Sequence, residues 1–211
     1  MSEQSKEIRI EKRKLLLAEG RDAELFLVWA CRKYGRQEDI QVIDFGGIKE
    51  LGTFLLTLSN VERFNEVETL VIARDAETDN QAALTSIRTA LKDASLPMPR
   101  DAFVYESQNN FKTAIMIFPG PKFSGGTLED LCLEIVKDDL VMPCVDDYLG
   151  CLKRVQSITK LTVSHKRKLH TYLAGKDKDF VGATIGQASY RNAWNSEHPA
   201  LKPFKDIIVD M

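Results

Sequence analysis

The sequence has no long apolar run, and none of its segments approaches the roughly 20 apolar residues that a membrane-spanning helix needs. Residues 1–14 are charged and lack an apolar core, so we expect no secretory signal there. The net charge of −2 gives no overall attraction to nucleic acid, and binding to a polyanion would depend on a local basic surface or a metal ion. We therefore expect no membrane contact and, by default, a cytoplasmic location.

Several sequence motifs are also missing. The four cysteines (Cys31, Cys132, Cys144 and Cys151) form no C-x-x-C pair and lie among apolar residues, so we expect reduced thiols in the core or in helices. The three histidines lack the spacing of zinc ligands. There is no P-loop, no G-x-G-x-x-G and no G-x-S-x-G, which argues against an intrinsic nucleotide hydrolase and an α/β-hydrolase.

Apolar runs of strand length alternate with segments of helical periodicity over the first half of the 211-residue chain. Strands are expected at residues 15–18, 40–45, 67–73, 102–106 and 113–118, and helices at residues 22–34, 48–58, 81–94, from Thr127 onward, 145–155, 163–173 and 201–208. This order predicts an α/β fold with a mainly parallel, Rossmann-like sheet flanked by helices and a helical C-terminal region. We expect residues 1–137 to form the α/β core and residues 138–211 a helical extension packed on it as one compact unit.

Acidic residues follow two of the predicted strands directly. Glu19 and Asp22 come after the first, and Asp75, Glu77 and Asp79 come after the third. If these strands are parallel neighbours, the carboxylates meet at one edge of the sheet, where ligands of open α/β sheets bind. A hard divalent cation would relieve their mutual repulsion. The alternative is structural, because Asp22 and Asp79 are also suited to capping the helices that follow.

The spacing of these residues resembles a known domain. An apolar strand ending in Glu19-Gly20, with Asp22 in an E-G-x-D pattern, precedes by about 55 residues an apolar strand ending in Asp75-x-Glu77. The pattern is similar to that of the Toprim domain, which is shared by topoisomerases, primases, ribosomal-RNA maturases and OLD-type nucleases. Three further stretches extend the likeness over nearly the whole chain, to an uncharacterised Toprim-related family close to the OLD-type nucleases: Gly46-Gly47, residues 126–130 and residues 166–173.

The resemblance implies roles for individual residues. Glu19 would be a metal ligand or a general acid/base, and Asp75 and Glu77 would be catalytic residues that hold Mg²⁺ or Mn²⁺. Glu129 resembles an additional acidic ligand of the OLD-type branch. Asp79, like Asp130, would serve a second metal or support the first ligands. Glu77 departs from the common pattern, which has Asp there, so its longer side chain puts catalytic competence in doubt more than metal binding.

A site of this kind implies metal-dependent hydrolysis or processing of nucleic acid. The chain is too short for a topoisomerase or a primase, and a nuclease fits its length better. One rival is a non-catalytic module that binds metal or nucleic acid, or acts beside a partner ATPase as OLD-type Toprim domains do. Another is the acidic pocket of a flavodoxin-like or response-regulator-like protein, which the Glu-Gly ending and the late Glu129 fit poorly.

The densest basic patch is His165 to Lys168, followed by His170. We expect Lys166, Arg167 and Lys168 to contact phosphates of DNA or RNA, and the alternative is an ordinary solvated helix face. A second basic run, residues 12–14, precedes the first strand and is expected at the opposite end of the sheet. The sequence does not determine the oligomeric state.

Overall fold

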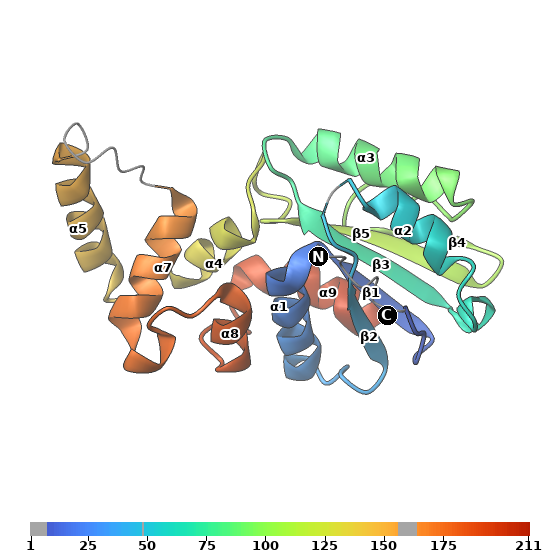
Figure 1. The fold of residues 1–211 in the computed structure, drawn as a ribbon, viewed down its shortest axis with the longest axis horizontal. Helices are drawn as coiled ribbons and strands as arrows, with labels where there is room; N and C mark the ends of the chain where they lie inside the picture. The colour runs from blue at the N-terminus through green and yellow to red at the C-terminus, as the bar shows by residue number, and fades with distance from the viewer. Residues whose placement is uncertain (1–7, 48, 156–163) are drawn as a thin grey trace, which may run out of the picture.

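The computed structural model describes residues 8–47, 49–155 and 164–211. It contains a five-stranded sheet of order β2-β1-β3-β5-β4 with helices on both faces (Figure 1). The strands are β1 (Lys14–Ala18), β2 (Ile40–Asp44), β3 (Thr69–Asp75), β4 (Tyr105–Gln108) and β5 (Phe111–Phe118). The α-helices are α1 (Gly20–Lys33), α2 (Leu51–Leu58), α3 (Asn80–Asp93), α4 (Leu128–Val136), α5 (Met142–Arg154), α7 (His165–Lys176), α8 (Ile185–Tyr190) and α9 (Lys202–Asp210).

Strand β3 lies at the centre of the sheet. It pairs in parallel with β1 on one side and with β5 on the other, and β2 pairs in parallel with β1. Only β4, among the strands described, is antiparallel, and it closes one edge against β5. The predicted α/β fold with a mainly parallel sheet is therefore confirmed.

Alternate residues of each central strand point to different faces of the sheet. Leu16 and Ala18 belong to the hydrophobic cluster that contains α1 and α9, whereas Leu15 and Leu17 belong to the cluster that contains α2 and α3. Burial on both faces explains why β1 and β3 are apolar runs without polar alternation. It also fixes the register, since a shift by one residue would exchange the two faces.

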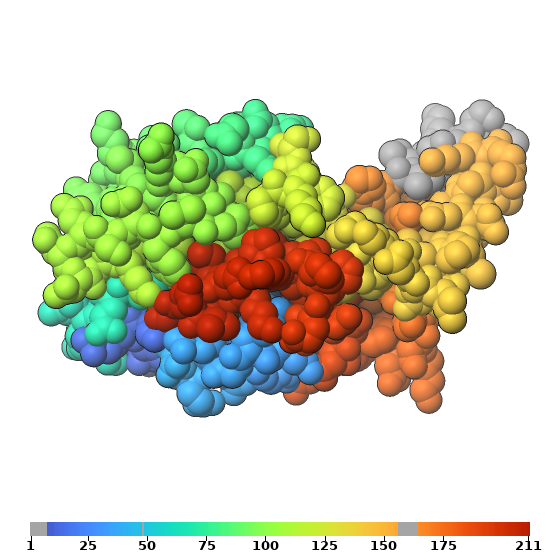
Figure 2. Space-filling model, turned by 180° about the vertical axis from the view of Figure 1, so that it is seen from behind, coloured from blue at the N-terminus to red at the C-terminus, as the bar shows by residue number. Residues whose placement is uncertain are grey.

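The C-terminal region returns to the α/β core. The Gly186 N–H, in α8, donates a 3.0 Å hydrogen bond to Asp22 Oδ1 at the start of α1, and the Tyr105 hydroxyl in β4 donates one to the Ile207 carbonyl in α9. Figure 2 shows the C-terminal segment (red) lying between α1 (blue) and residues near β4 (green). One buried cluster includes residues from both regions, so the extension is packed on the core; the boundary predicted at residue 137 stays a prediction.

Some boundaries differ from the sequence prediction. The strand expected at residues 102–106 lies at Tyr105–Gln108, because Phe103 has a left-handed φ of 61° that ends any extended segment. Helix α7 extends through Gly175 to Lys176, beyond the end expected at residue 173. Helix α8 was not predicted, although its Thr184–Gln187 capping box is visible in the sequence. Residues 48 and 163, at the starts of two expected helices, lie outside the described residues.

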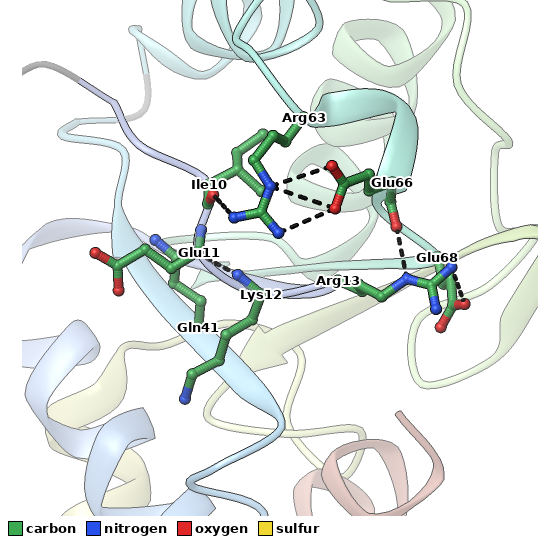
Figure 3. A network of polar contacts seen from close by, with 8 residues as sticks. All are labelled: Ile10, Glu11, Lys12, Arg13, Gln41, Arg63, Glu66 and Glu68. Carbon is green, nitrogen blue, oxygen red and sulfur yellow. Dashed lines mark hydrogen bonds and ion pairs between the residues drawn. The ribbon is translucent and has the colours of Figure 1, made fainter.

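The amino-terminal end of the sheet is held by an ion-pair network (Figure 3). Arg63 donates to the Ile10 carbonyl at 3.1 Å and pairs with Glu66 at 2.9 Å, and Arg13 pairs with Glu68 at 2.8 Å. The basic run at residues 12–14 therefore lies away from the acidic edge, as expected.

All four cysteines are free thiols. Cys31 and Cys132 are buried, and burial raises the pKa of Cys31 to about 12 and that of Cys132 well above its usual value. Cys144 and Cys151 are exposed on α5. Within the described ranges, no helix has the length and apolar character needed to cross a bilayer.

Candidate functional site

Glu19 and Asp75 lie at neighbouring strand ends. The Glu19 N–H donates a 3.1 Å hydrogen bond to the Ala73 carbonyl, which continues the β1–β3 ladder beyond β1. Glu19 therefore lies beside the last residues of β3. This is the edge at which open α/β sheets bind ligands, and the sequence prediction that the two acidic endings meet is confirmed.

Asp75 occupies the centre of the acidic edge. Its Oδ1 accepts a 2.9 Å hydrogen bond from the Leu128 N–H in the first turn of α4. Burial, reinforced by the nearby charges of Glu19, Glu129 and Glu77 and opposed by this hydrogen bond, raises the pKa of Asp75 to about 7. Asp75 is thus close enough to interact electrostatically with Glu19, Glu77 and Glu129, although these residues come from the ends of β1 and β3 and from α4.

Arg74 is a buried cation within this acidic group. Its side chain is only 3% exposed, and its Nε lies 3.6 Å from Glu19 Oε2. It also donates to the Asp75 carbonyl at 3.2 Å and to Ser86 Oγ at 3.3 Å. Burial lowers the pKa of Arg74, and the charges of Glu19, Asp75 and Glu77 oppose that effect. Sequence reasoning missed this residue, although an arginine inside an otherwise apolar strand was a visible signal.

Glu77 is held in an uncommon backbone conformation. Its φ is 58°, in the left-handed region that residues other than glycine seldom adopt. Two backbone hydrogen bonds with Gly126, of 2.9 and 2.7 Å, fix it there. A Cβ on the adjacent Gly125 would lie 2.7 Å from the Thr78 carbonyl oxygen, so only glycine permits this approach. Such outliers concentrate at functional sites.

The remaining acidic candidates divide into two groups. Glu129 lies in the first turn of α4 and contributes to the charge around Asp75.

Asp79 caps α3, accepting a 2.7 Å hydrogen bond from the Gln81 N–H. Asp130 closes the capping box of α4 with Thr127 and also contacts His165. Asp79 and Asp130 therefore have structural partners. Asp22 has one as well, because its Oδ1 accepts a hydrogen bond from the Gly186 N–H.

Asp44 supports the Glu19-Gly20 turn. Its Oδ1 accepts hydrogen bonds from the Gly20 N–H at 3.0 Å and from the Gly46 N–H at 2.8 Å. Gly20 and Gly46 both have positive φ values, of 80° and 86°. The sequence analysis did not identify this aspartate, because its role depends on the pairing of β2 with β1.

A groove of about 720 Å³ lies beside the acidic edge. Glu77 and Glu129 line it from the core, and His165 and Lys166 line it from the start of α7. Arg167 and Lys168, the other two basic residues predicted to bind nucleic acid, do not line this groove. Arg167 is the third residue of α7, and Lys168 pairs with Asp146 of α5 at 2.6 Å. Of the predicted basic patch, the structure thus brings Lys166 to the acidic site.

The carboxylates of the acidic edge are the kind of ligand that a hard cation prefers, but they do not surround a single point. Among the residues described, no three His, Cys, Asp or Glu side chains form a group arranged to hold a metal ion. Mg²⁺ typically takes one or two protein carboxylates and keeps several waters, and Asp75 with Glu77 or Glu129 supplies that number. The pKa of Asp75 is raised mainly by burial and also by repulsion from the neighbouring carboxylates, and a bound cation would relieve that repulsion.

Comparison with known proteins gives a family but no activity. A family model matches residues 13–211, and the family is described as a protein of unknown function (DUF3226). No curated protein matches the chain. No solved structure matches it either.

Proposed function

We propose that this chain, which belongs to the DUF3226 family and inherits no established activity from it, is a metal-dependent enzyme that hydrolyses phosphodiester bonds in nucleic acid. The observation that carries the proposal is the placement of the buried Asp75 beside Glu19 at adjacent strand ends, where burial and three neighbouring glutamates raise its pKa to about 7. A carboxyl group perturbed in this way at a strand end is typical of a functional site. The relationship to Toprim domains is part of the proposal and is supported by the Glu19-Gly20 and Asp75-x-Glu77 pattern.

Asp75, together with Glu77 or Glu129, would hold Mg²⁺ or Mn²⁺. When bound, such an ion polarises a phosphoryl oxygen and lowers the pKa of a coordinated water toward neutrality. The Leu128 N–H orients the Asp75 carboxylate through Oδ1 and leaves Oδ2 for the ion. The backbone bonds to Gly126 fix the position from which Glu77 reaches the site.

Glu19 would serve as a second ligand or as a general acid/base. Its Oε2 lies 3.6 Å from Arg74 Nε, so the carboxylate forms an ion pair with this buried cation. Asp79 and Asp130 keep their capping roles in this proposal and support α3 and α4.

The groove would hold the nucleic-acid strand. Lys166 lines it opposite the acidic residues, where its ammonium is suited to a phosphate oxygen. A local cation is needed because the whole chain carries a net charge of −2. A cytoplasmic location belongs to the proposal and is supported by the four free thiols, which a reducing compartment preserves.

The direct test is cleavage of labelled single- and double-stranded DNA and RNA by the purified protein. We expect cleavage with Mg²⁺ or Mn²⁺ and none with a chelating agent, because the proposed chemistry requires the ion. A panel without any metal-dependent cleavage, in conditions where calorimetry detects ion binding, would contradict a nuclease function.

Lys166 and Lys168 provide a matched pair for testing the groove. Lys166→Ala is expected to weaken nucleic-acid binding and to reduce the slope of log affinity against log salt by about 1, as the loss of one phosphate contact does. Lys168→Ala should leave both nearly unchanged, because Lys168 is engaged with Asp146. Titrations at several salt concentrations measure both effects, and equal losses in the two variants would contradict this placement of the strand.

A non-catalytic module is the second candidate. The observation that favours it is Arg74, because a protein cation already lies beside Glu19 and reduces the demand for a metal. In that case the chain would bind metal or nucleic acid without cleaving it, or act with a partner such as an ATPase. Binding of oligonucleotides without turnover under every metal condition would support this candidate.

A further inference from the structure

Helix α5 packs on one side only. Its buried residues Met142, Val145 and Leu149 belong to the hydrophobic cluster that also contains Leu169 and Leu173 of α7. In Figure 1, α5 lies at the end of the molecule, with α7 between it and the rest of the fold. Figure 2 shows the same hairpin projecting from the body. The described residues on the outer side of α5 are mostly exposed to solvent.

A second apolar stripe runs along this open side. Cys144, Tyr148 and Cys151 follow one another at intervals of four and three residues, which is the spacing of a coiled-coil seam. Cys144 and Cys151 are exposed, and the Tyr148 side chain is 53% exposed. At 3.6 residues per turn, this stripe lies roughly a third of a turn from the face on α7. A helix with two such stripes can pack against two neighbours, as helices in four-helix bundles do.

Charged residues along one flank of the stripe indicate the orientation of the missing neighbour. Asp147, in the middle of α5, and Arg154, at its C-terminal end, lie on the flank away from α7, and neither forms an ion pair with any described residue. In an antiparallel pair of α5 helices, Tyr148 meets Cys151 of the partner subunit. The same alignment places Asp147 opposite Arg154 of the partner subunit, twice by symmetry. A parallel pair would set like helix ends side by side, which the helix dipoles disfavour.

We propose that the outer face of α5 binds a second copy of this chain. The two α5 helices pair in antiparallel fashion around a two-fold axis, and with both α7 helices they form a four-helix bundle. The interface is self-complementary, as a two-fold interface must be. It is small and apolar along the seam, with one ion pair on either side of the two-fold axis, so association is expected to be reversible.

Sedimentation equilibrium over a range of micromolar concentrations tests the proposal. The wild-type chain of 23.8 kDa should show a monomer–dimer equilibrium. Tyr148→Glu places a charge in the centre of the seam and should leave only monomer. Leu56→Glu is the matched control, because Leu56 is a similarly exposed apolar residue on α2, and it should not change the dissociation constant. Far-ultraviolet circular dichroism verifies that both variants are folded.

A charge exchange tests the antiparallel alignment itself. Asp147→Arg alone, or Arg154→Asp alone, replaces two attractive pairs by two repulsive ones and should weaken the dimer about tenfold. The double variant restores opposite charges and should recover the wild-type dissociation constant. A wild-type chain that stays monomeric, or a double variant no better than the single ones, would overturn the proposal.

Discussion

Asp75→Asn is expected to reduce metal-dependent cleavage by about three orders of magnitude or more while the fold stays intact. Charge stabilisation by a bound ion contributes several kcal/mol to such reactions, and each 1.36 kcal/mol corresponds to a tenfold change in rate. Asparagine keeps an oxygen that can accept the Leu128 N–H, so the contact between β3 and α4 survives. Turnover by the variant in Mg²⁺ and Mn²⁺, compared with the wild type, measures the effect.

Asp79→Asn is the appropriate control for this substitution. Asp79 lies four residues from Asp75, and its substitution by asparagine removes the same charge. Its side chain, however, caps α3 by accepting a hydrogen bond from the Gln81 N–H. Asparagine is an equally good cap, so cleavage and stability should change little. If the Asp75 variant cleaves as well as the wild type, the cation site does not lie at the end of β3.

Asp75→Asn is also expected to stabilise the metal-free protein above neutral pH. The carboxyl of Asp75 has a pKa of about 7 in the folded chain against an ordinary value of 3.8, so the folded state holds the proton more tightly than the unfolded state. Its contribution to stability is complete below the unfolded value and is lost as pH rises through about 7. At about 1.4 kcal/mol per pKa unit, the loss amounts to a few kcal/mol.

Denaturant unfolding at about pH 5 and about pH 8, with a chelating agent present, measures this loss. The advantage of the asparagine variant over the wild type should grow between the two values, because only the wild type must ionise a buried carboxyl group. Adding Mg²⁺ or Mn²⁺ at the higher pH should stabilise the wild type and leave the variant unchanged. A free-energy difference that is the same at both pH values would show that Asp75 titrates normally.

The sheet was predictable because its central strands are buried on both faces. Continuous apolar runs such as Leu15 to Ala18 are sufficient to identify them, and the glycines and prolines between elements limit the alternatives. The edge strand β4 was misplaced because Tyr105–Gln108 is mostly exposed and carries no apolar pattern. Helix α8 is only six residues long, too short for helical periodicity to be visible.

The sequence was sufficient to predict the part of the site that lies at the ends of the strands. Glu19 and Asp75 follow from the rule that parallel strands end at one edge, and the structure brings them together. Arg74 and Asp44 were missed because their roles depend on which strands are neighbours and on contacts formed after folding. Lys166 could not be distinguished from Lys168 in the sequence, since only the packing of α7 against α5 determines which of them faces the groove.

The hydrogen bond between Leu128 and Asp75 has a consequence for biosynthesis. It joins residues 53 positions apart, and it needs α4 in place. A ribosome-bound chain therefore carries a complete β3, with its buried arginine and aspartate, well before the partner of Asp75 has been synthesised. If the acidic edge is a nuclease site, the enzyme becomes competent only after more than half of its 211 residues have been translated.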